Sequence, residues 1–135
     1  MNTTKRILII DDEVHIREVV QICLETLVSW DVLSAASGRE GLIRVQAEQL
    51  DAILLDVMMP EMDGLVVLRE LRSNPVTQPI PVILLTATAH RLDQQQVSEL
   101  GVRGVIAKPF NPITLPHQIS LALGWDLEPL ITCCA

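Results

Sequence analysis

The stretch Asp51-Ala-Ile-Leu-Leu-Asp56-Val-Met-Met-Pro60-Glu-Met-Asp63-Gly64 decides how the rest of the chain is read. Its apolar run, Ala52 to Leu55, is too short for a helix and is typical of a buried strand. Pro60 and Gly64 mark a turn soon after it. Asp56 is therefore predicted at the end of a strand. A carboxylate at the end of a strand is more often a turn or cap residue than a reactive group. A functional role for Asp56 therefore needs support from other parts of the sequence.

Strand and helix patterns alternate along the whole chain. Short apolar or β-branched runs predict strands at 5–10, 31–36, 52–55, 81–86 and 104–107. Apolar residues at a 3.6-residue period follow each strand and predict five helices. The helix boundaries rest on a capping box at 37–40, Asp63 as a cap, Gly101 as a left-handed end, Thr114 as a cap with Pro116 in the first turn, and Gly124 as the last end. Short connections between such units predict an α/β fold with a doubly wound parallel sheet and helices on both faces.

Composition restricts the class of partner. The chain has 135 residues and a formal charge of −7, and its Lys and Arg residues do not cluster, which speaks against direct nucleic-acid binding. No run of 18 apolar residues and no secretory start is present, so no membrane contact is expected. We expect one cytoplasmic domain over residues 1–124, a short tail over 125–135, no separate output module, and proteins as partners.

Side chains that carry chemistry follow four of the five predicted strands: Asp11 and Asp12, then Asp56, Thr86 and Lys108. In open parallel sheets, ligands bind outside the carboxyl ends of the strands. Carboxylates gathered there repel one another by roughly 4 kcal/mol per pair at 4 Å, which one lysine does not offset. A hard divalent cation does, and few carboxylates with room for water suit Mg²⁺. A carboxylate beside Mg²⁺ and an ammonium group is placed to attack a phosphoryl group and form an aspartyl phosphate.

The chain resembles the receiver domains of two-component response regulators, the chemotaxis-regulator-like family, over residues 5 to about 123. The resemblance rests on Ile-Leu-Ile-Ile-Asp11-Asp12-Glu, Leu-Leu-Asp56-Val-Met-Met-Pro60-Glu-Met-Asp-Gly64, Leu-Leu-Thr86-Ala87 and Ala107-Lys108-Pro109-Phe110. It implies a flavodoxin-like sheet with strand order 2-1-3-4-5.

The resemblance also implies a role for each site residue. Asp56 is expected to accept phosphate from a sensor histidine kinase or a phosphotransfer protein, and the protein then changes the surface it shows to a downstream protein. Mg²⁺ is expected on Asp12, Asp56 and the backbone carbonyl of Met58, with Asp11 holding a metal-bound water. Lys108 is expected to pair with Asp56 and then with the phosphoryl oxygens, Thr86 to move toward them, and the bond before Pro109 to be cis.

The sequence departs from the family at two places. The family usually has Tyr or Phe three residues before the lysine, where this chain has Val105, so the aromatic part of the switch is absent. Two neighbours of the phosphoryl site tune its loss to water in the family, and here they are Met58 and Thr88. Met58 offers no side-chain hydrogen bond to an attacking water, so slow self-dephosphorylation is expected.

Two other functions compete with the phosphoacceptor, which catalyses only its own phosphorylation and is otherwise not an enzyme. One is a pseudo-receiver that binds partners without phosphorylation. The other is a haloacid-dehalogenase-type phosphohydrolase, disfavoured because Asp56 is followed by Val57-Met58 and not by a second acid two residues on. The apolar tail is expected to pack on its own domain, with homodimerisation as the alternative. Cys23 is expected in the core, and Cys133 and Cys134 have no assigned role.

Overall fold

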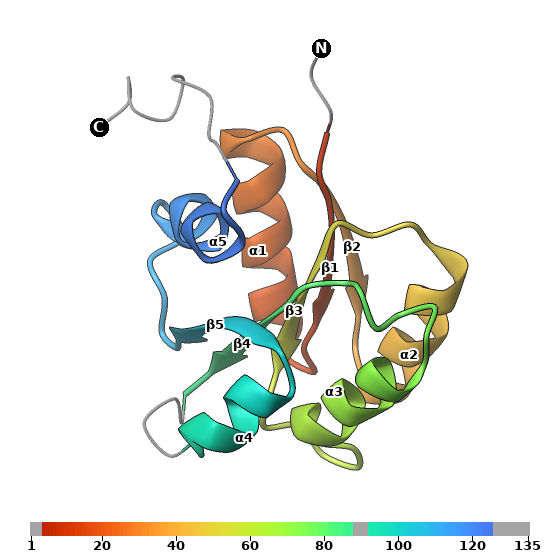
Figure 1. Ribbon diagram of the computed structural model, residues 1–135. Coiled ribbons are helices and arrows are strands. Elements are labelled where there is room, and N and C mark those ends of the chain that lie inside the picture. Colours follow the sequence, from red (N-terminus) through yellow and green to blue (C-terminus); the bar gives the residue numbers. More distant parts are fainter. Residues whose placement is uncertain (1–3, 88–91, 126–135) are drawn as a thin grey trace.

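Parallel strands and helices alternate throughout the computed structural model, which describes residues 4–87 and 92–125. The strands are β1 Arg6–Ile10, β2 Asp31–Ala35, β3 Ala52–Asp56, β4 Val82–Thr86 and β5 Val102–Ala107. The helices are α1 Val14–Leu27, α2 Gly38–Ala47, α3 Gly64–Ser73, α4 Gln94–Glu99 and α5 Leu115–Leu123. The strands form one sheet in the order β2-β1-β3-β4-β5, and every pairing is parallel (Figure 1). This confirms the predicted doubly wound, flavodoxin-like sheet.

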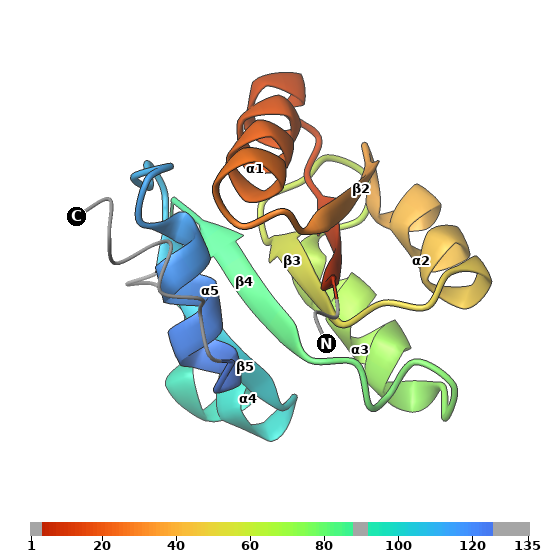
Figure 2. The same ribbon diagram turned by 90° about the horizontal axis from the view of Figure 1, so that it is seen from above.

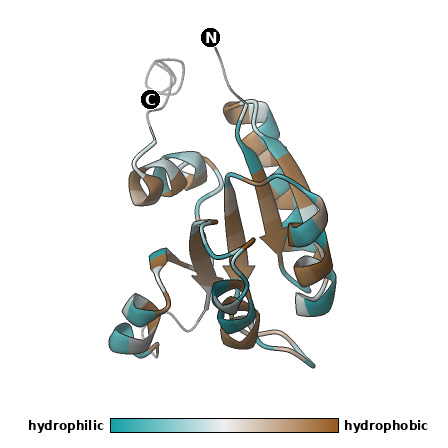
Figure 3. Cartoon of the chain, turned by 45° about the vertical axis from the view of Figure 1, so that its right-hand side comes forward, coloured by the Kyte–Doolittle hydropathy of each residue, from teal (hydrophilic) through white to brown (hydrophobic). Residues whose placement is uncertain are grey.

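Helices cover the two faces of the sheet unequally. Helices α1 and α5 pack on one face, and α2, α3 and α4 pack on the other (Figure 2). Side chains alternate between these faces along a strand. In β1, Ile7 and Ile9 join the cluster under α1 and α5, whereas Leu8 and Ile10 join the cluster under α2 and α3. Figure 3 shows the result, with hydrophobic residues concentrated in the sheet and polar ones on the outer sides of the helices.

Local capping signals fix several helix starts. Ser37 Oγ accepts a hydrogen bond from the Glu40 N–H at 3.1 Å, as the capping box predicts. The Glu40 carboxylate reaches back to the N–H of Ala36, at 2.7 Å. Asp63 accepts from two N–H groups at the start of α3. These interactions hold α2 and α3 at fixed positions beside the central strands.

Two elements differ from the prediction by more than one residue. The α4 helix covers only Gln94–Glu99, so Leu92 and Leu100 flank it, although both pack against the apolar cluster beneath. Strand β5 begins at Val102, two residues earlier than predicted, because it continues past a register irregularity opposite Val82 and Ile83. Gly101 joins the two elements with φ of 72°, the left-handed conformation that the sequence predicts there.

The final helix begins where expected but is capped differently. Thr114 occupies the N-cap position and Pro116 lies in the first turn, yet the Thr114 side chain makes no cap hydrogen bond to the helix. Its hydroxyl instead contacts the carbonyl of Asn111, whose own side chain accepts from the N–H of Ile113 at 2.9 Å. Asn111 therefore shapes the turn, and Gly124 ends the helix with φ of 71°.

The first residue of the predicted tail packs on its own domain. Trp125 lies edge-to-face on Trp30, with ring centroids 5.3 Å apart, and the Lys5 ammonium group lies 4.6 Å from its ring. Cys23 is buried, as predicted, and burial raises the pKa of its thiol to about 11. The predictions for Thr88, Cys133, Cys134 and the tail beyond Trp125 fall outside the described residues. Among the helices of the described chain, none has the length and apolar character needed to cross a bilayer.

Candidate functional site

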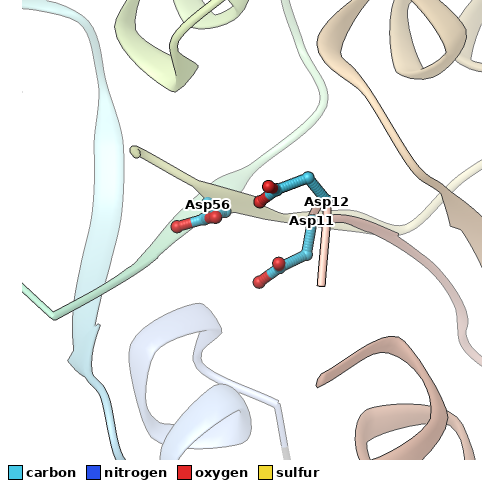
Figure 4. Close-up of side chains that lie close together, drawn as sticks. All are labelled: Asp11, Asp12 and Asp56. Atoms are coloured by element: carbon cyan, nitrogen blue, oxygen red, sulfur yellow. The ribbon is translucent and has the colours of Figure 1, made fainter. Parts of the chain in front are cut away.

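The predicted carboxylates meet because β1 and β3 are neighbours in the sheet. Ile10 pairs with Leu55, so Asp11 leaves β1 beside Asp56, the last residue of β3. Each of Asp11, Asp12 and Asp56 offers a ligand atom, and these atoms lie within 4.8 Å of one another. Figure 4 shows the Asp11 and Asp12 carboxylates extending from the end of β1 toward the side on which Asp56 lies. Asp11 and Asp56 are buried and Asp12 is exposed, so the group opens to solvent at Asp12.

Asp11 is the most firmly held of the three carboxylates. One oxygen accepts the N–H of Glu13 and the other accepts from Lys108 Nζ, each at 2.8 Å. Its backbone is held as well, because its N–H donates to the carbonyl of Ala35 and its carbonyl accepts from Arg17 at 2.8 Å. A fully buried carboxylate needs such partners, since charge without them is costly to bury. Asp11 is therefore positioned before any ligand arrives.

Lys108 supplies the positively charged ammonium group that the sequence predicts at this site. Its Nζ lies 2.8 Å from Asp11 Oδ2, 3.4 Å from Asp56 Oδ1 and 3.7 Å from Glu13 Oε1. The shortest contact is with Asp11, and the predicted pairing with Asp56 is present as well. Burial alone would lower the pKa of Lys108, but the hydrogen bond to Asp11 and the three acidic charges raise it overall. The bond from Lys108 to Pro109 is cis, as expected.

Asp56 lies in an environment that resists its ionisation. Its side chain is almost fully buried, and this burial, followed by the charge of Asp11, raises its pKa to about 6. Lys108 and the N–H of Met58, which is 3.4 Å from Asp56 Oδ1, act in the opposite direction. The carboxylate is therefore still largely ionised at neutral pH, while its charge is poorly compensated. Such a group gains most from an added cation.

Gly64 explains how the backbone after Asp56 is packed. Its N–H donates to the carbonyl of Val57 at 2.9 Å. A Cβ at position 64 would stand 2.2 Å from the carbonyl oxygen of Asp56, closer than atoms can approach. Only glycine lets the start of α3 lie this near the end of β3. Gly64 thus supports the site from the backbone side.

The remaining predicted residues lie on β4, on β5 and in the segment that follows β3. Thr86 is buried at the end of β4, which pairs with β3, and its carbonyl accepts the N–H of Lys108 at 2.9 Å. Met58 projects outward beside Asp56 with 63% of its surface exposed. Val105 lies within β5 opposite Leu84 and is partly buried against the cluster under α4. Position 105 thus carries an aliphatic side chain that packs against this cluster.

The three carboxylates fit a hard divalent cation. Mg²⁺ in proteins takes oxygen ligands from one or two carboxylates and keeps several waters. Asp12 and Asp56 supply such oxygens, Asp11 lies within reach of a metal-bound water, and the exposed side at Asp12 admits solvent. The donor set contains only oxygen, which disfavours softer metals.

Two supporting residues were not predicted from the sequence. Arg17 donates to the Asp11 carbonyl from the first turn of α1, and Glu13 places a third acid near Lys108. Glu13 adjoins the acidic pair in the sequence and could have been included. No local pattern distinguishes Arg17 from other polar residues of the helix, so its contact is visible only in the fold.

Comparison with known proteins agrees with this geometry. The family model described as "Response regulator receiver domain" matches residues 7–120. The chain therefore belongs to the receiver domains of response regulators, a class that acts in two-component phosphorelay signalling. Receiver domains bind Mg²⁺ in an acidic pocket and interact with kinases or phosphotransfer proteins and with downstream targets.

Curated relatives are longer than this chain. A "Probable transcriptional regulator ycf27" from Cyanophora paradoxa is 39% identical over 95% of the chain and 52% of the relative. The "Alkaline phosphatase synthesis transcriptional regulatory protein PhoP" of Bacillus subtilis (strain 168) is 38% identical over 88% of the chain and 48% of the relative. The chain thus spans about half the length of the curated relatives it matches.

Solved structures match over nearly their full length. The chemotaxis protein CheY4 of Vibrio cholerae, crystallised at low pH, has a TM-score of 0.82 and 31% identity, covering 89% of this chain and 99% of the other. The response regulator protein TrrA of Thermotoga maritima, solved in complex with Mg²⁺-BeF, has a TM-score of 0.76 and 29% identity, covering 88% and 99%.

Proposed function

We propose that the chain accepts a phosphoryl group on Asp56 from a phosphohistidine of a sensor histidine kinase or phosphotransfer protein, in a Mg²⁺-dependent reaction. The observation that carries this proposal is the placement of Asp56, buried at a strand end between a held carboxylate, Asp11, and the Lys108 ammonium group. Support also comes from the TrrA structure, which was solved in complex with Mg²⁺-BeF.

The chemistry is a phosphoryl transfer between two groups. An oxygen of the Asp56 carboxylate forms a bond to phosphorus while the phosphorus–nitrogen bond of the donor breaks and its electron pair stays on the imidazole. Mg²⁺, when bound by Asp12, Asp56 and the Met58 carbonyl, supplies positive charge against the phosphoryl oxygens. Lys108 lies 3.4 Å from Asp56 Oδ1, near enough to hold the same oxygens once the acyl phosphate exists. Thr86 is the neighbouring hydroxyl that would hydrogen-bond them.

The phosphorylated chain then changes the surface that it presents to a downstream protein. On this proposal it acts in the cytoplasm, acts on no other substrate and catalyses only its own phosphorylation and dephosphorylation. Loss of the phosphoryl group is slow, because Met58 has no side-chain donor or acceptor suited to orienting water. Direct binding to nucleic acid is not part of the proposal, since the chain carries a formal charge of −7.

A second candidate is a binding module that works without phosphorylation. One observation favours it, namely Val105, which is packed in β5 where the family usually has an aromatic residue. The buried, mutually repelling Asp11 and Asp56 favour the phosphoacceptor, since binding alone does not require them.

Incubation with acetyl phosphate tests the proposal. Intact-mass measurement with Mg²⁺ should show the gain of one phosphoryl group, and omission of Mg²⁺ should abolish it. Asp12→Asn changes an exposed metal-binding carboxylate. It should raise the Mg²⁺ concentration needed for labelling without unfolding the chain. Absence of any mass gain in a sample shown to bind Mg²⁺ would favour the binding module.

A further inference from the structure

An arginine far from the acidic site connects two loops at the opposite end of the sheet, where the strands begin. Arg72 lies in the last turn of α3, and its guanidinium group donates only to backbone carbonyls. The distances are 2.7 Å to Leu100, 2.8 Å to Gln78, 3.0 Å to Ile80 and 3.3 Å to Gly101. Gln78 and Ile80 belong to the connection between α3 and β4, and Leu100 and Gly101 lie between α4 and β5.

Arg72 does not act as a member of an ion pair. Within the described chain no carboxylate lies within ion-pair distance of it. Partial burial lowers the pKa of its guanidinium group. A rigid, planar fork with five N–H donors is suited to several fixed carbonyls at once, whereas a lysine ammonium group is not. The residue type therefore matches the geometry it serves.

Two of the carbonyls that Arg72 holds, those of Leu100 and Gly101, lie just beyond the C-terminal end of α4. The last carbonyls of any helix have no intrahelical donor. Leu100 and Gly101 directly follow α4, and the left-handed Gly101, with φ of 72°, turns the chain into β5. The Arg72 fork donates to both carbonyls. A positive charge at a helix C-terminus is also favourable for the helix dipole.

The Arg72 contacts lie at the end of the sheet opposite the acidic site. Because β4 and β5 begin just after the held loops, Arg72 lies where these strands start, whereas Asp56 lies where β3 ends. The N-terminal end of α4 follows Thr86 along the chain and so lies toward the acidic site. Helix α4 thus runs from the carboxyl ends of the strands toward their amino ends, with Val97 buried beneath it.

We propose that Arg72 is a positioning residue that fixes the C-terminal end of α4 to the α3–β4 connection. The end of α4 nearer Thr86 is then the end at which changes around Asp56 reach the helix, a consequence that rests on the proposed function. The surface of α4 then changes because the helix moves about its fixed C-terminal end, and the whole helix is not displaced.

Amide hydrogen exchange on the full chain tests the anchor. Arg72→Met removes the fork, and Arg72→Lys keeps the charge without it. The matched control is Thr77→Val, which deletes a buried 2.7 Å hydrogen bond to the Leu71 carbonyl in the same α3–β4 connection; the Thr77 hydroxyl bonds to the Leu71 and Asn74 carbonyls and not to Leu100 or Gly101. Both Arg72 variants should exchange about tenfold faster or more over residues 97–102, as loss of two hydrogen bonds predicts. Thr77→Val should lose protection over 71–80 alone.

Three results would overturn the anchor. The first is unchanged exchange over 97–102 in Arg72→Met, the second is full protection in Arg72→Lys, and the third is equal loss there in Thr77→Val. Labelling by acetyl phosphate serves as a separate readout and should proceed at the wild-type rate in the Arg72 variants. If the wild type itself takes no label, the proposed function fails while the exchange result still decides the anchor.

Discussion

Replacing Asp56 by asparagine should stabilise the metal-free protein at neutral pH. In the folded protein, burial and the charge of Asp11 raise the pKa of Asp56 from 3.8 to about 6. The shift is about 2 pH units, and each unit corresponds to about 1.36 kcal/mol, so ionised Asp56 costs about 3 kcal/mol of folding free energy. Asparagine has nearly the same shape and no charge, and Lys108 keeps its 2.8 Å contact with Asp11.

The sign of the pH dependence follows from proton binding. Between pH 3.8 and about 6 the folded protein holds the Asp56 proton more tightly than the unfolded chain does. The free energy of unfolding therefore falls as pH rises through this window, and the penalty is fully present above the folded pKa. Below 3.8 both states are protonated and the penalty is absent.

Urea unfolding of wild type and Asp56→Asn measures this effect. The stability difference between the two proteins should grow by about 3 kcal/mol in favour of the variant between about pH 4 and about pH 8. Mg²⁺ should stabilise the wild type far more than the variant, since the cation compensates the Asp56 charge. A difference that does not change with pH, or that favours the wild type at neutral pH without Mg²⁺, would show that ionised Asp56 does not destabilise the fold.

Three further substitutions have definite expected outcomes. Gly64→Ala should lower the free energy of unfolding by at least about 2 kcal/mol, because its Cβ would stand 2.2 Å from the Asp56 carbonyl oxygen, and a urea midpoint equal to wild type would contradict this. Lys108→Met should cost roughly 3 kcal/mol at neutral pH by leaving the buried Asp11 charge without its cation, and added Mg²⁺ should restore part of the loss in the same urea titration. Met58→Asn should shorten the lifetime of the phosphorylated protein several-fold by orienting water beside Asp56, as followed by intact mass after removal of the donor; an unchanged lifetime would assign Met58 to covering the site alone.

Local signals in the sequence were enough for most of the fold. The five apolar runs, the cap residues Ser37 and Asp63 and the left-handed Gly101 and Gly124 each act within a few residues, so their effects can be read without the tertiary structure. The length of α4 could not be read in this way. Leu92 and Leu100 continue the apolar period outside the helix, because burial and not helical geometry places them.

The site was predictable in its membership and not in its contacts. Strand ends meet at one edge of a parallel sheet, which is sufficient to gather Asp11, Asp12 and Asp56. The preference of Lys108 for Asp11 depends on the direction in which each carboxylate points, and this is set by hydrogen bonds such as that from the Glu13 N–H. The four carbonyl contacts of Arg72 depend on two loops far apart in the sequence. No periodicity or motif encodes such contacts.

Locating the phosphoryl group on the chain decides whether Asp56 is the acceptor. Three carboxylates lie within 4.8 Å of one another, so total mass alone does not identify the acceptor. The protein is labelled with acetyl phosphate and Mg²⁺, the acyl phosphate is reduced with borohydride, and the modified residue is identified by tandem mass spectrometry. We expect modification at Asp56, abolished in Asp56→Asn. Modification at Asp11 or Asp12 in the wild type, or undiminished labelling of the variant, would contradict it.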